Sequence, residues 1–154
     1  MARQKVLVPY NFTLNDQKAI HFIIRTFAQN RDIEFTLFHA YIPLPEIETE
    51  SNAVLGKLKG TMLSLATELR KQESFLKGAN KKLQDNGFSD DQLDYVFKPM
   101  DKEIPYEIAE KTLMDKYDLV ILNRKPGRIS RLFGKSISGK VLSILNDTAV
   151  CIIS

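Results

Sequence analysis

The chain has 154 residues, of which 44% are hydrophobic and 27% are charged, and its formal net charge at pH 7 is +3. These values are typical of one globular domain with its own core, and they exclude a disordered or fibrous chain. No apolar run approaches the roughly 20 residues of a membrane span, and the single cysteine, Cys151, excludes an internal disulfide. With no signal peptide before the first strand, we expect one cytoplasmic domain over residues 1–154, with no membrane contact and no specific nucleic-acid signal.

Strands and helices are predicted to alternate along the chain. Short apolar runs predict five strands, near residues 4–9, 34–41, 93–98, 118–123 and 148–153. Thr13 or Asn15 can cap the first helix, Pro105 lies near the start of a later one, and Ser136 is the expected N-cap of the last. This order predicts an α/β fold, a single-domain three-layer sandwich with a five-stranded, mostly parallel sheet and right-handed crossovers.

An extended helical segment is predicted over about residues 50–85. Its apolar residues recur every three or four positions, with only Gln72 breaking the series: Leu55, Leu58, Met62, Leu65, Leu69, Leu76, Ala79 and Leu83. A helix of about 30 residues would be about 45 Å long, more than a domain of this size can cover. Gly56, Gly60 and Gly78 are therefore candidate points where the helix starts late, bends or frays. The stripe predicts core packing, with an oligomer or partner contact as the alternative.

A basic loop is predicted between the fourth strand and the last helix. Its cations, with no carboxylate among them, are Arg124, Lys125, Arg128, Arg131, Lys135 and Lys140. Glycine and serine in such a loop, followed by the N-terminus of a helix, favour phosphate binding through free N–H groups. Residues 134–136 (GKS) match the end of a P-loop, but the leading glycine of that motif would fall at Ile129. The pattern predicts an anion-binding loop and does not support a P-loop.

Four segments together resemble the universal stress protein family: residues 6–13 (VLVPYNFT), 37–40 (LFHA), 118–122 (DLVIL) and 148–153 (TAVCII). The resemblance covers nearly the whole chain, except the helical middle from about residue 46 to residue 87. It implies the adenine nucleotide alpha hydrolase-like, or Rossmann-like, form of the sandwich. It also implies that the first and fourth strands lie side by side, with a crevice for ligands at their carboxyl ends.

The resemblance further implies which residues line this crevice, with Tyr10 and Phe12 among them. Asn11 and Thr13 stand where the family has an acid and a hydroxyl after the first strand, and His39 and Asp118 match its histidine and aspartate. ATP-binding members carry glycines where this chain has Asn123 and Gly127, and a closing Gly-Ser where it has Lys135 and Ser136. The implied ligand is an adenine nucleotide, ATP or AMP, and the implied contacts are Asn11, Thr13, Ala40, Asn123, Gly127, Arg128, Ser130 and Ser136.

The function that the resemblance implies is a stress-response or regulatory module that acts by binding and not by catalysis. Two alternatives remain open: a protein-interaction module that binds no nucleotide, and a weak nucleotide hydrolase. His21 and His39 lie on separate elements, so the sequence predicts neither a metal site nor a catalytic triad. The last strand, Ala149 to Ile153, is apolar and is expected at a sheet edge, and we therefore expect a homodimer joined through it.

Overall fold

The computed structural model describes residues 2–45, 52–124 and 136–154, and the side chains of residues 52–55 are left out. Its elements are, in chain order, β1 Gln4–Pro9, α1 Leu14–Phe27, β2 Ile33–Tyr41, α2 Asn52–Asp85, a 3₁₀ turn Asp90–Gln92, β3 Leu93–Pro99, α3 Ile104–Met114, β4 Leu119–Asn123, α4 Ile137–Ile144 and β5 Ala149–Ile153. All five predicted strands are confirmed, and each end lies within one residue of its predicted position.

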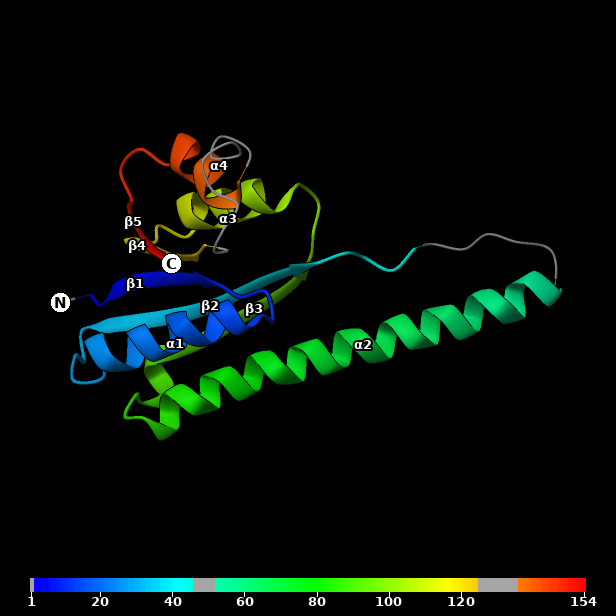
Figure 1. Ribbon diagram of the computed structural model, residues 1–154, viewed down its shortest axis with the longest axis horizontal. Helices are drawn as coiled ribbons and strands as arrows, with labels where there is room; N and C mark the ends of the chain where they lie inside the picture. Colours follow the sequence, from blue (N-terminus) through cyan, green and yellow to red (C-terminus); the bar gives the residue numbers. More distant parts are fainter. Residues whose placement is uncertain (1, 46–51, 125–135) are drawn as a thin grey trace.

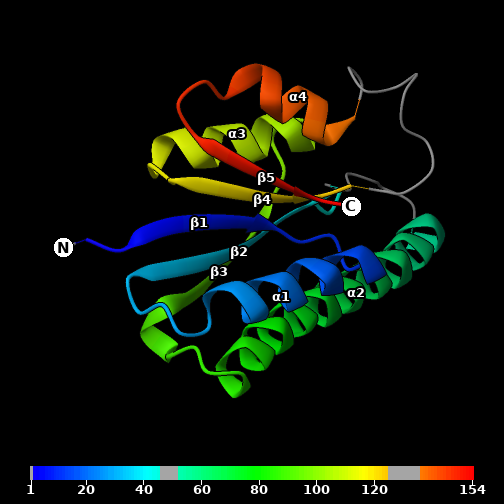
Figure 2. The same cartoon turned by 60° about the vertical axis from the view of Figure 1, so that its left-hand side comes forward.

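The five strands form one sheet in the order β3-β2-β1-β4-β5, and every pair is parallel. Helices α1 and α2 cover one face of the sheet, and α3 and α4 cover the other (Figures 1 and 2). The predicted three-layer sandwich is therefore confirmed. The strand order reverses between β1 and β4, which pair at Val6 with Leu119 and at Leu7 with Val120. This reversal is the switch point at which open α/β sheets bind their ligands.

The sheet is buried on both faces, which explains why its central strands are almost entirely apolar. Val6 and Val8 of β1 pack with α1 and α2 in one core, whereas Leu7 packs with α3 and α4 in the other. In β4 the same alternation places the side chain of Ile121 in the first core and that of Val120 in the second. The two cores hold the carboxyl ends of β1 and β4 in fixed register, and we refer to the switch point between these ends as the crevice.

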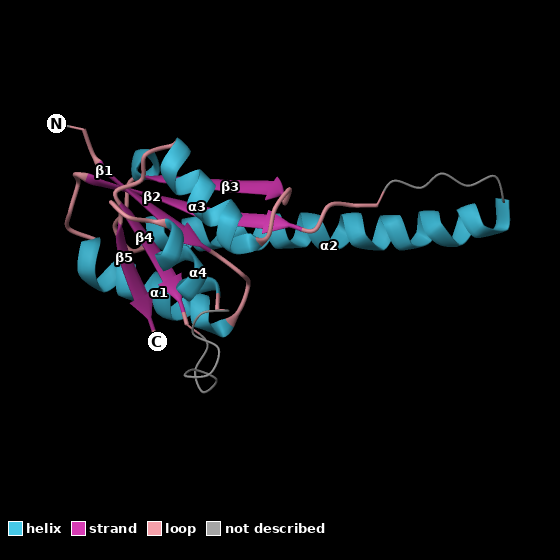
Figure 3. Cartoon of the chain, turned by 90° about the horizontal axis from the view of Figure 1, so that it is seen from above, coloured by secondary structure: helices cyan, strands magenta, loops and turns pink. Residues whose placement is uncertain are grey.

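Helix α2 is the feature in which the structure departs most from expectation. It runs without interruption from Asn52 to Asp85, so none of the three glycines that were expected to break or delay it does so. A Cβ added at Gly56, Gly60 or Gly78 would meet nothing within 4 Å, because each faces open space. The first half of the helix extends well beyond the end of the sheet (Figures 1 and 3). No helix in the described ranges is long and apolar enough to cross a membrane.

Candidate functional site

A buried carboxylate, Asp16, organises the crevice at the carboxyl end of β1. Asp16 lies in the first turn of α1 and is only 2% exposed. Its Oδ2 accepts hydrogen bonds from the backbone N–H of Asn11 at 3.1 Å, the backbone N–H of Thr13 at 2.7 Å and the hydroxyl of Thr13 at 3.0 Å. A carboxylate there also complements the positive end of the helix. Asp16 therefore fixes the turn that leads from β1 into α1.

Asn123, the last residue of β4, connects the other side of the crevice to the same carboxylate. Its side-chain N–H₂ donates to Oδ1 of Asp16 at 3.0 Å, which joins residues 107 positions apart in the chain. The carboxylate accepts only, so this contact fixes which end of the amide faces Asp16. The other end, Oδ1 of Asn123, is buried and has no hydrogen-bond partner among the described residues. A buried acceptor without a donor is costly and marks a place where a water or a ligand group is expected.

The predicted contacts on the β1 side have separate roles. Thr13, one of the two positions predicted to cap the first helix, is the N-cap of α1, and its hydroxyl donates to Asp16. Asn11 has an exposed side chain beside the crevice, and only its backbone N–H is tied to Asp16. Tyr10, expected to line the crevice, is instead buried in the core, where its hydroxyl accepts from the amide of Gln17 at 3.0 Å.

His39 and Phe12 close the crevice on the β2 side. Nδ1 of His39 lies 2.7 Å from the carbonyl oxygen of Tyr10, and the ring must donate because a carbonyl only accepts. Burial holds the pKa of His39 below its usual value, while the Tyr10 carbonyl and Asp16 act in the opposite direction. The ring of Phe12 packs edge-on against His39 with centroids 4.7 Å apart, and Phe12 has a backbone φ of 58°. The crevice wall is thus aromatic and held in a strained turn.

Ala40 presents backbone at the same place. The last register pair between β1 and β2 is Pro9 with Phe38, so β2 continues for three residues past the end of that pairing. In a strand, alternate residues point their N–H and C=O to the same side. The backbone groups of Ala40 therefore point in the same direction as those of Phe38, whose carbonyl accepts from Tyr10 N–H at 2.8 Å. Ala40 thus faces the crevice beyond the end of β1, although its side chain is buried on the opposite core.

The phosphate side of the predicted site lies partly outside the described residues. Gly127, Arg128 and Ser130 belong to that undescribed stretch, and nothing can be said of their positions. Ser136 is the N-cap of α4, as predicted, and its hydroxyl accepts from the backbone N–H of Gly139 at 3.0 Å. Within the described residues, then, the fold brings together Asn11, Thr13 and Asn123 around Asp16. Sequence reasoning missed Asp16, although Thr13 and Asp16 have the spacing of a capping box.

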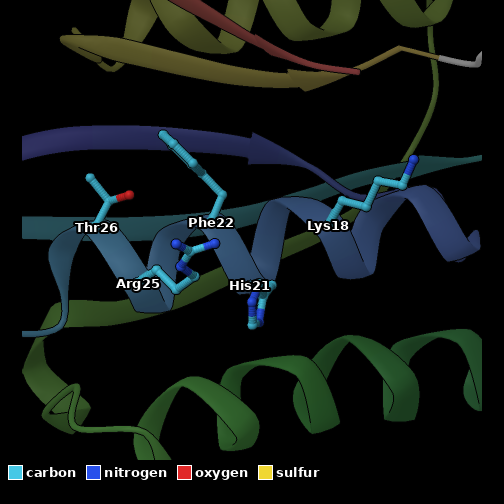
Figure 4. A pocket seen from close by; sticks show the side chains of 5 residues that line it. All are labelled: Lys18, His21, Phe22, Arg25 and Thr26. Carbon is cyan, nitrogen blue, oxygen red and sulfur yellow. The ribbon is translucent and has the colours of Figure 1, made fainter.

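A concave region lies along the surface of α1, apart from the switch point (Figure 4). It has a volume of about 450 Å³ and is lined by Lys18, His21, Phe22, Arg25 and Thr26. His21 points toward α2 and is exposed. Among the described residues, no group of three or more His, Cys, Asp or Glu is arranged to hold a metal ion.

Comparison with known proteins places this architecture in a family. Residues 2–146 match the family model described as "Universal stress protein family". Among solved structures, UspA from Lactobacillus plantarum is 14% identical, with 100% of this chain and 99% of that chain covered and a TM-score of 0.66. The universal stress protein from Archaeoglobus fulgidus in complex with dAMP is 13% identical, with 100% of both chains covered and a TM-score of 0.63. A family protein from Arabidopsis thaliana with AMP bound is 16% identical, with 97% of this chain and 90% of that chain covered and a TM-score of 0.58.

A search of curated proteins found no match. The structural neighbours are too distant in sequence to show more than the fold, but the family model spans nearly the whole chain, from just before β1 to just after α4. The chain belongs to the universal stress protein family.

Proposed function

We propose that this chain binds an adenine nucleotide, AMP or ATP, in the crevice between the carboxyl ends of β1 and β4. The observation that carries the proposal is the buried Oδ1 of Asn123, which has no donor among the described residues. It lies at the switch point of the sheet, where a ligand N–H or hydroxyl could supply that donor. Two structural neighbours with this fold were solved with dAMP and with AMP, which supports an adenine nucleotide as the ligand.

The chain offers a distinct group to each part of such a ligand. The backbone N–H and C=O of Ala40 suit the edge of an adenine ring, which has both acceptors and a donor. The exposed amide of Asn11 can bond the ribose or the base, replacing the acid that the family carries there. We assign the phosphates to Gly127, Arg128 and Ser130 and to the start of α4 at Ser136, because small residues, a cation and a helix N-terminus favour anions.

The proposed role is binding without turnover. A nucleotide hydrolase needs a base that can accept a proton from water or position it near the phosphates. Asp16 is the buried carboxylate of this crevice, and both of its oxygens already accept hydrogen bonds from Asn11, Thr13 and Asn123. It is therefore committed to holding the turn. Weak hydrolysis remains the alternative, and release of phosphate from ATP by the purified protein would support it.

Calorimetric titration tests the binding proposal directly. We expect the wild-type protein to bind AMP or ATP, and Asn123→Ala and Gly127→Val each to weaken binding by tenfold or more, about 1.4 kcal/mol. Asn80→Ala is the matched control, because Oδ1 of Asn80 is also buried with no partner among the described residues but belongs to α2 and not to β1 or β4. Heats equal to those of buffer at millimolar ATP, ADP and AMP would reject nucleotide binding. Equal losses in Asn123→Ala and Asn80→Ala would reject this crevice as the site.

We further propose that the chain forms a homodimer through β5. This strand lies at the edge of the sheet, and its residues from Val150 to Ile153 are half-buried and apolar. An apolar edge strand is a template for pairing, and a two-fold axis would join two copies of it antiparallel. Ile152→Lys should convert the dimer to monomer in light scattering, because it places a charge from each copy within the paired apolar strands. Leu113→Lys, at an exposed leucine of α3, is the control that should not change the mass. A monomer mass for the wild-type protein at high concentration in light scattering would contradict the proposal.

A further inference from the structure

Positive charge is compensated differently on the two sides of the sheet. On the side of α3 and α4, lysines are paired with carboxylates: Lys102 with Glu110, Lys111 with Asp115 and Lys140 with Glu103. On the other side, α1 and residues 70–85 of α2 carry seven exposed cations: Lys18, Arg25, Arg70, Lys71, Lys77, Lys81 and Lys82. Within the described residues, none of these seven lies within ion-pair distance of a carboxylate. The charge of the layer formed by α1 and α2 is therefore uncompensated.

The groups that do contact these cations are neutral. The ammonium of Lys71 lies 5.8 Å from the centroid of the Phe75 ring. The ammonium of Lys82 donates to the side-chain oxygen of Gln17 at 3.3 Å. A ring or an amide leaves the full charge of an ammonium in place, so an anion that reaches this layer has no ion pair to break.

One face of α2 brings two of these cations beside α1. Lys71, Phe75 and Lys82 fall on the same side of the helix, because they are spaced by four and seven residues. The bond from Lys82 to Gln17 shows that this side faces α1. Lys71 and Lys82 are about 16 Å apart along the helix. The nearest carboxylate along the same face is that of Glu68, one turn before Lys71 and at the outer end of the row.

The hollow along α1 supplies the second half of this surface. Two of its lining residues are Lys18 and Arg25, which are seven residues and about 10 Å apart along the helix (Figure 4). Phe22 lines it between them, and its ring is held by an edge-on contact with Phe27 at a centroid distance of 6.1 Å. The volume of about 450 Å³ is within the range of small-ligand sites. We call the following six residues the cationic track: Lys18, Phe22, Arg25, Lys71, Phe75 and Lys82.

We propose that the cationic track binds single-stranded nucleic acid, without sequence preference, along the boundary between α1 and α2. Proteins that do so combine a positively charged surface, which follows the phosphate backbone, with aromatic side chains on which bases stack. The track has four cations and, at Phe75, a ring that is 52% exposed. In this arrangement phosphates lie against the cations, one base stacks on Phe75, and another enters the hollow beside Phe22. The sequence shows no nucleic-acid motif because these residues come together only in the fold.

The composition of the layer favours a polynucleotide over a protein or a membrane. In α1 and residues 70–85 of α2, the exposed large apolar residues are Leu14 and Phe75, so a protein partner would find few apolar anchors. A helix that lies on a membrane presents an apolar face, whereas the exposed side of α2 between its cations carries Ser74 and Gly78. Contacts with a phosphate backbone need cations and polar groups, and no apolar face.

Fluorescence anisotropy with a labelled oligo(dT) of about 12 nucleotides tests the proposal. We expect binding that weakens as salt rises, with a slope of about −3 in a double-logarithmic plot if four cations each neutralise a phosphate. Lys71→Gln and Lys82→Gln together should reduce that slope by about 1.4. The matched control is Lys102→Gln with Lys111→Gln, which removes the same charge from the α3 side. Absence of binding at low salt, or equal effects of the two double variants, would overturn the track.

Phe75→Ala separates stacking from charge. We expect it to weaken binding of oligo(dT) by about fivefold or more and to leave the salt slope unchanged, because it removes a ring and no charge. Tyr106→Ala is the matched control, since Tyr106 is an aromatic residue of α3 that is 48% exposed, and it should have no effect. Equal effects of the two variants would overturn the proposal. Equally tight binding of a duplex of the same length would also overturn it, because paired bases cannot stack on Phe75.

Competitors identify the site and the class of partner. Millimolar AMP should leave oligo(dT) bound, and displacement by AMP would overturn the track by placing the oligonucleotide in the crevice. Polyglutamate and phosphatidylserine vesicles of equal total charge should displace oligo(dT) poorly, and equal displacement by either would overturn the assignment to nucleic acid. None of the substituted residues belongs to the crevice, so AMP titration of the same variants keeps a failure of the track distinct from a failure of nucleotide binding.

Discussion

The carboxylate of Asp16 offers the sharpest test of how the crevice is held together. Four donors converge on it: two backbone N–H groups, the Thr13 hydroxyl and the Asn123 amide. Asp16→Asn retains the shape of the side chain but removes the charge and replaces one acceptor oxygen with a donor. At least one of the surrounding donors then faces another donor across a buried contact. Asp16→Ala removes the acceptors altogether, and with them the capping-box bond from Asp16 to the backbone of the N-cap Thr13.

The expected magnitude follows from the number of bonds lost. Hydrogen bonds to a charged group contribute about 1.5–3 kcal/mol each, and a buried donor left without a partner costs about 1–3 kcal/mol. Because Asp16→Asn can keep the bonds to the turn through its remaining oxygen, we expect a loss of about 2–3 kcal/mol in the free energy of unfolding. Asp16→Ala should cost about 3–5 kcal/mol. For a protein of this size each kcal/mol lowers Tm by roughly 2–4 °C.

Urea unfolding of both variants, monitored by circular dichroism, measures these losses. Asp32→Asn is the matched control, because it makes the same chemical change at an exposed position and should alter stability by less than about 0.5 kcal/mol. If Asp16→Asn is no less stable than Asp32→Asn, the carboxylate does not hold the turn. Asp16→Asn should also weaken nucleotide binding, since the orientation of Asn123 depends on it.

Three further predictions concern titration and backbone strain. Burial raises the pKa of Glu107, but the Lys98 ammonium at 2.7 Å and two backbone N–H groups outweigh it and hold that pKa below its usual value. The ionised carboxylate of Glu107 therefore stabilises the fold above about pH 4.3, the unfolded pKa, and this contribution is lost as pH falls through the folded pKa. Glu107→Gln should reduce the loss of unfolding free energy at acid pH, measured by urea unfolding. The pKa of His39 is lowered, so an NMR titration should give a midpoint below about 6.5, and stability should decline as pH falls from there. Lys116→Gly should stabilise the protein by about 0.5–1 kcal/mol in thermal unfolding, because Lys116 is exposed and has a φ of 54° just after α3. Phe12→Gly should instead destabilise the protein, because the contacts of the Phe12 ring are lost.

The fold could be predicted from the sequence because its signals are local. Strands buried on both faces appear as continuous apolar runs such as residues 119–122, and their ends are marked by proline, glycine or asparagine. The prediction of Thr13 and Ser136 as N-caps was correct for the same reason, since capping depends on the few residues that follow. The length of α2 was predicted well, but its continuity was not, because intrinsic glycine propensity is a weak guide inside a long helix.

The site was harder to predict because its central contact is not local. The spacing of Thr13 and Asp16 indicates a cap, but nothing in the sequence indicates that the other oxygen of Asp16 receives the amide of Asn123, 107 residues later. The burial of Tyr10, expected in the crevice, depends in the same way on tertiary packing. Contacts that join distant segments are fixed by the sheet order, and they can be read only when the strands have been placed.

Two departures of this chain from the family pattern, at Asn11 and at Asn123, are connected through Asp16. Where nucleotide-binding members have a glycine after the fourth strand, Asn123 supplies a side chain whose N–H₂ bonds Asp16, which a glycine could not do. The added side chain does more than reduce the space for a ligand, because the same bond holds Oδ1 of Asn123 in a buried position with its acceptor unused. An acceptor fixed before binding loses no conformational entropy when a ligand donor reaches it. Replacement of the glycine is therefore compatible with a crevice that binds a nucleotide by different contacts.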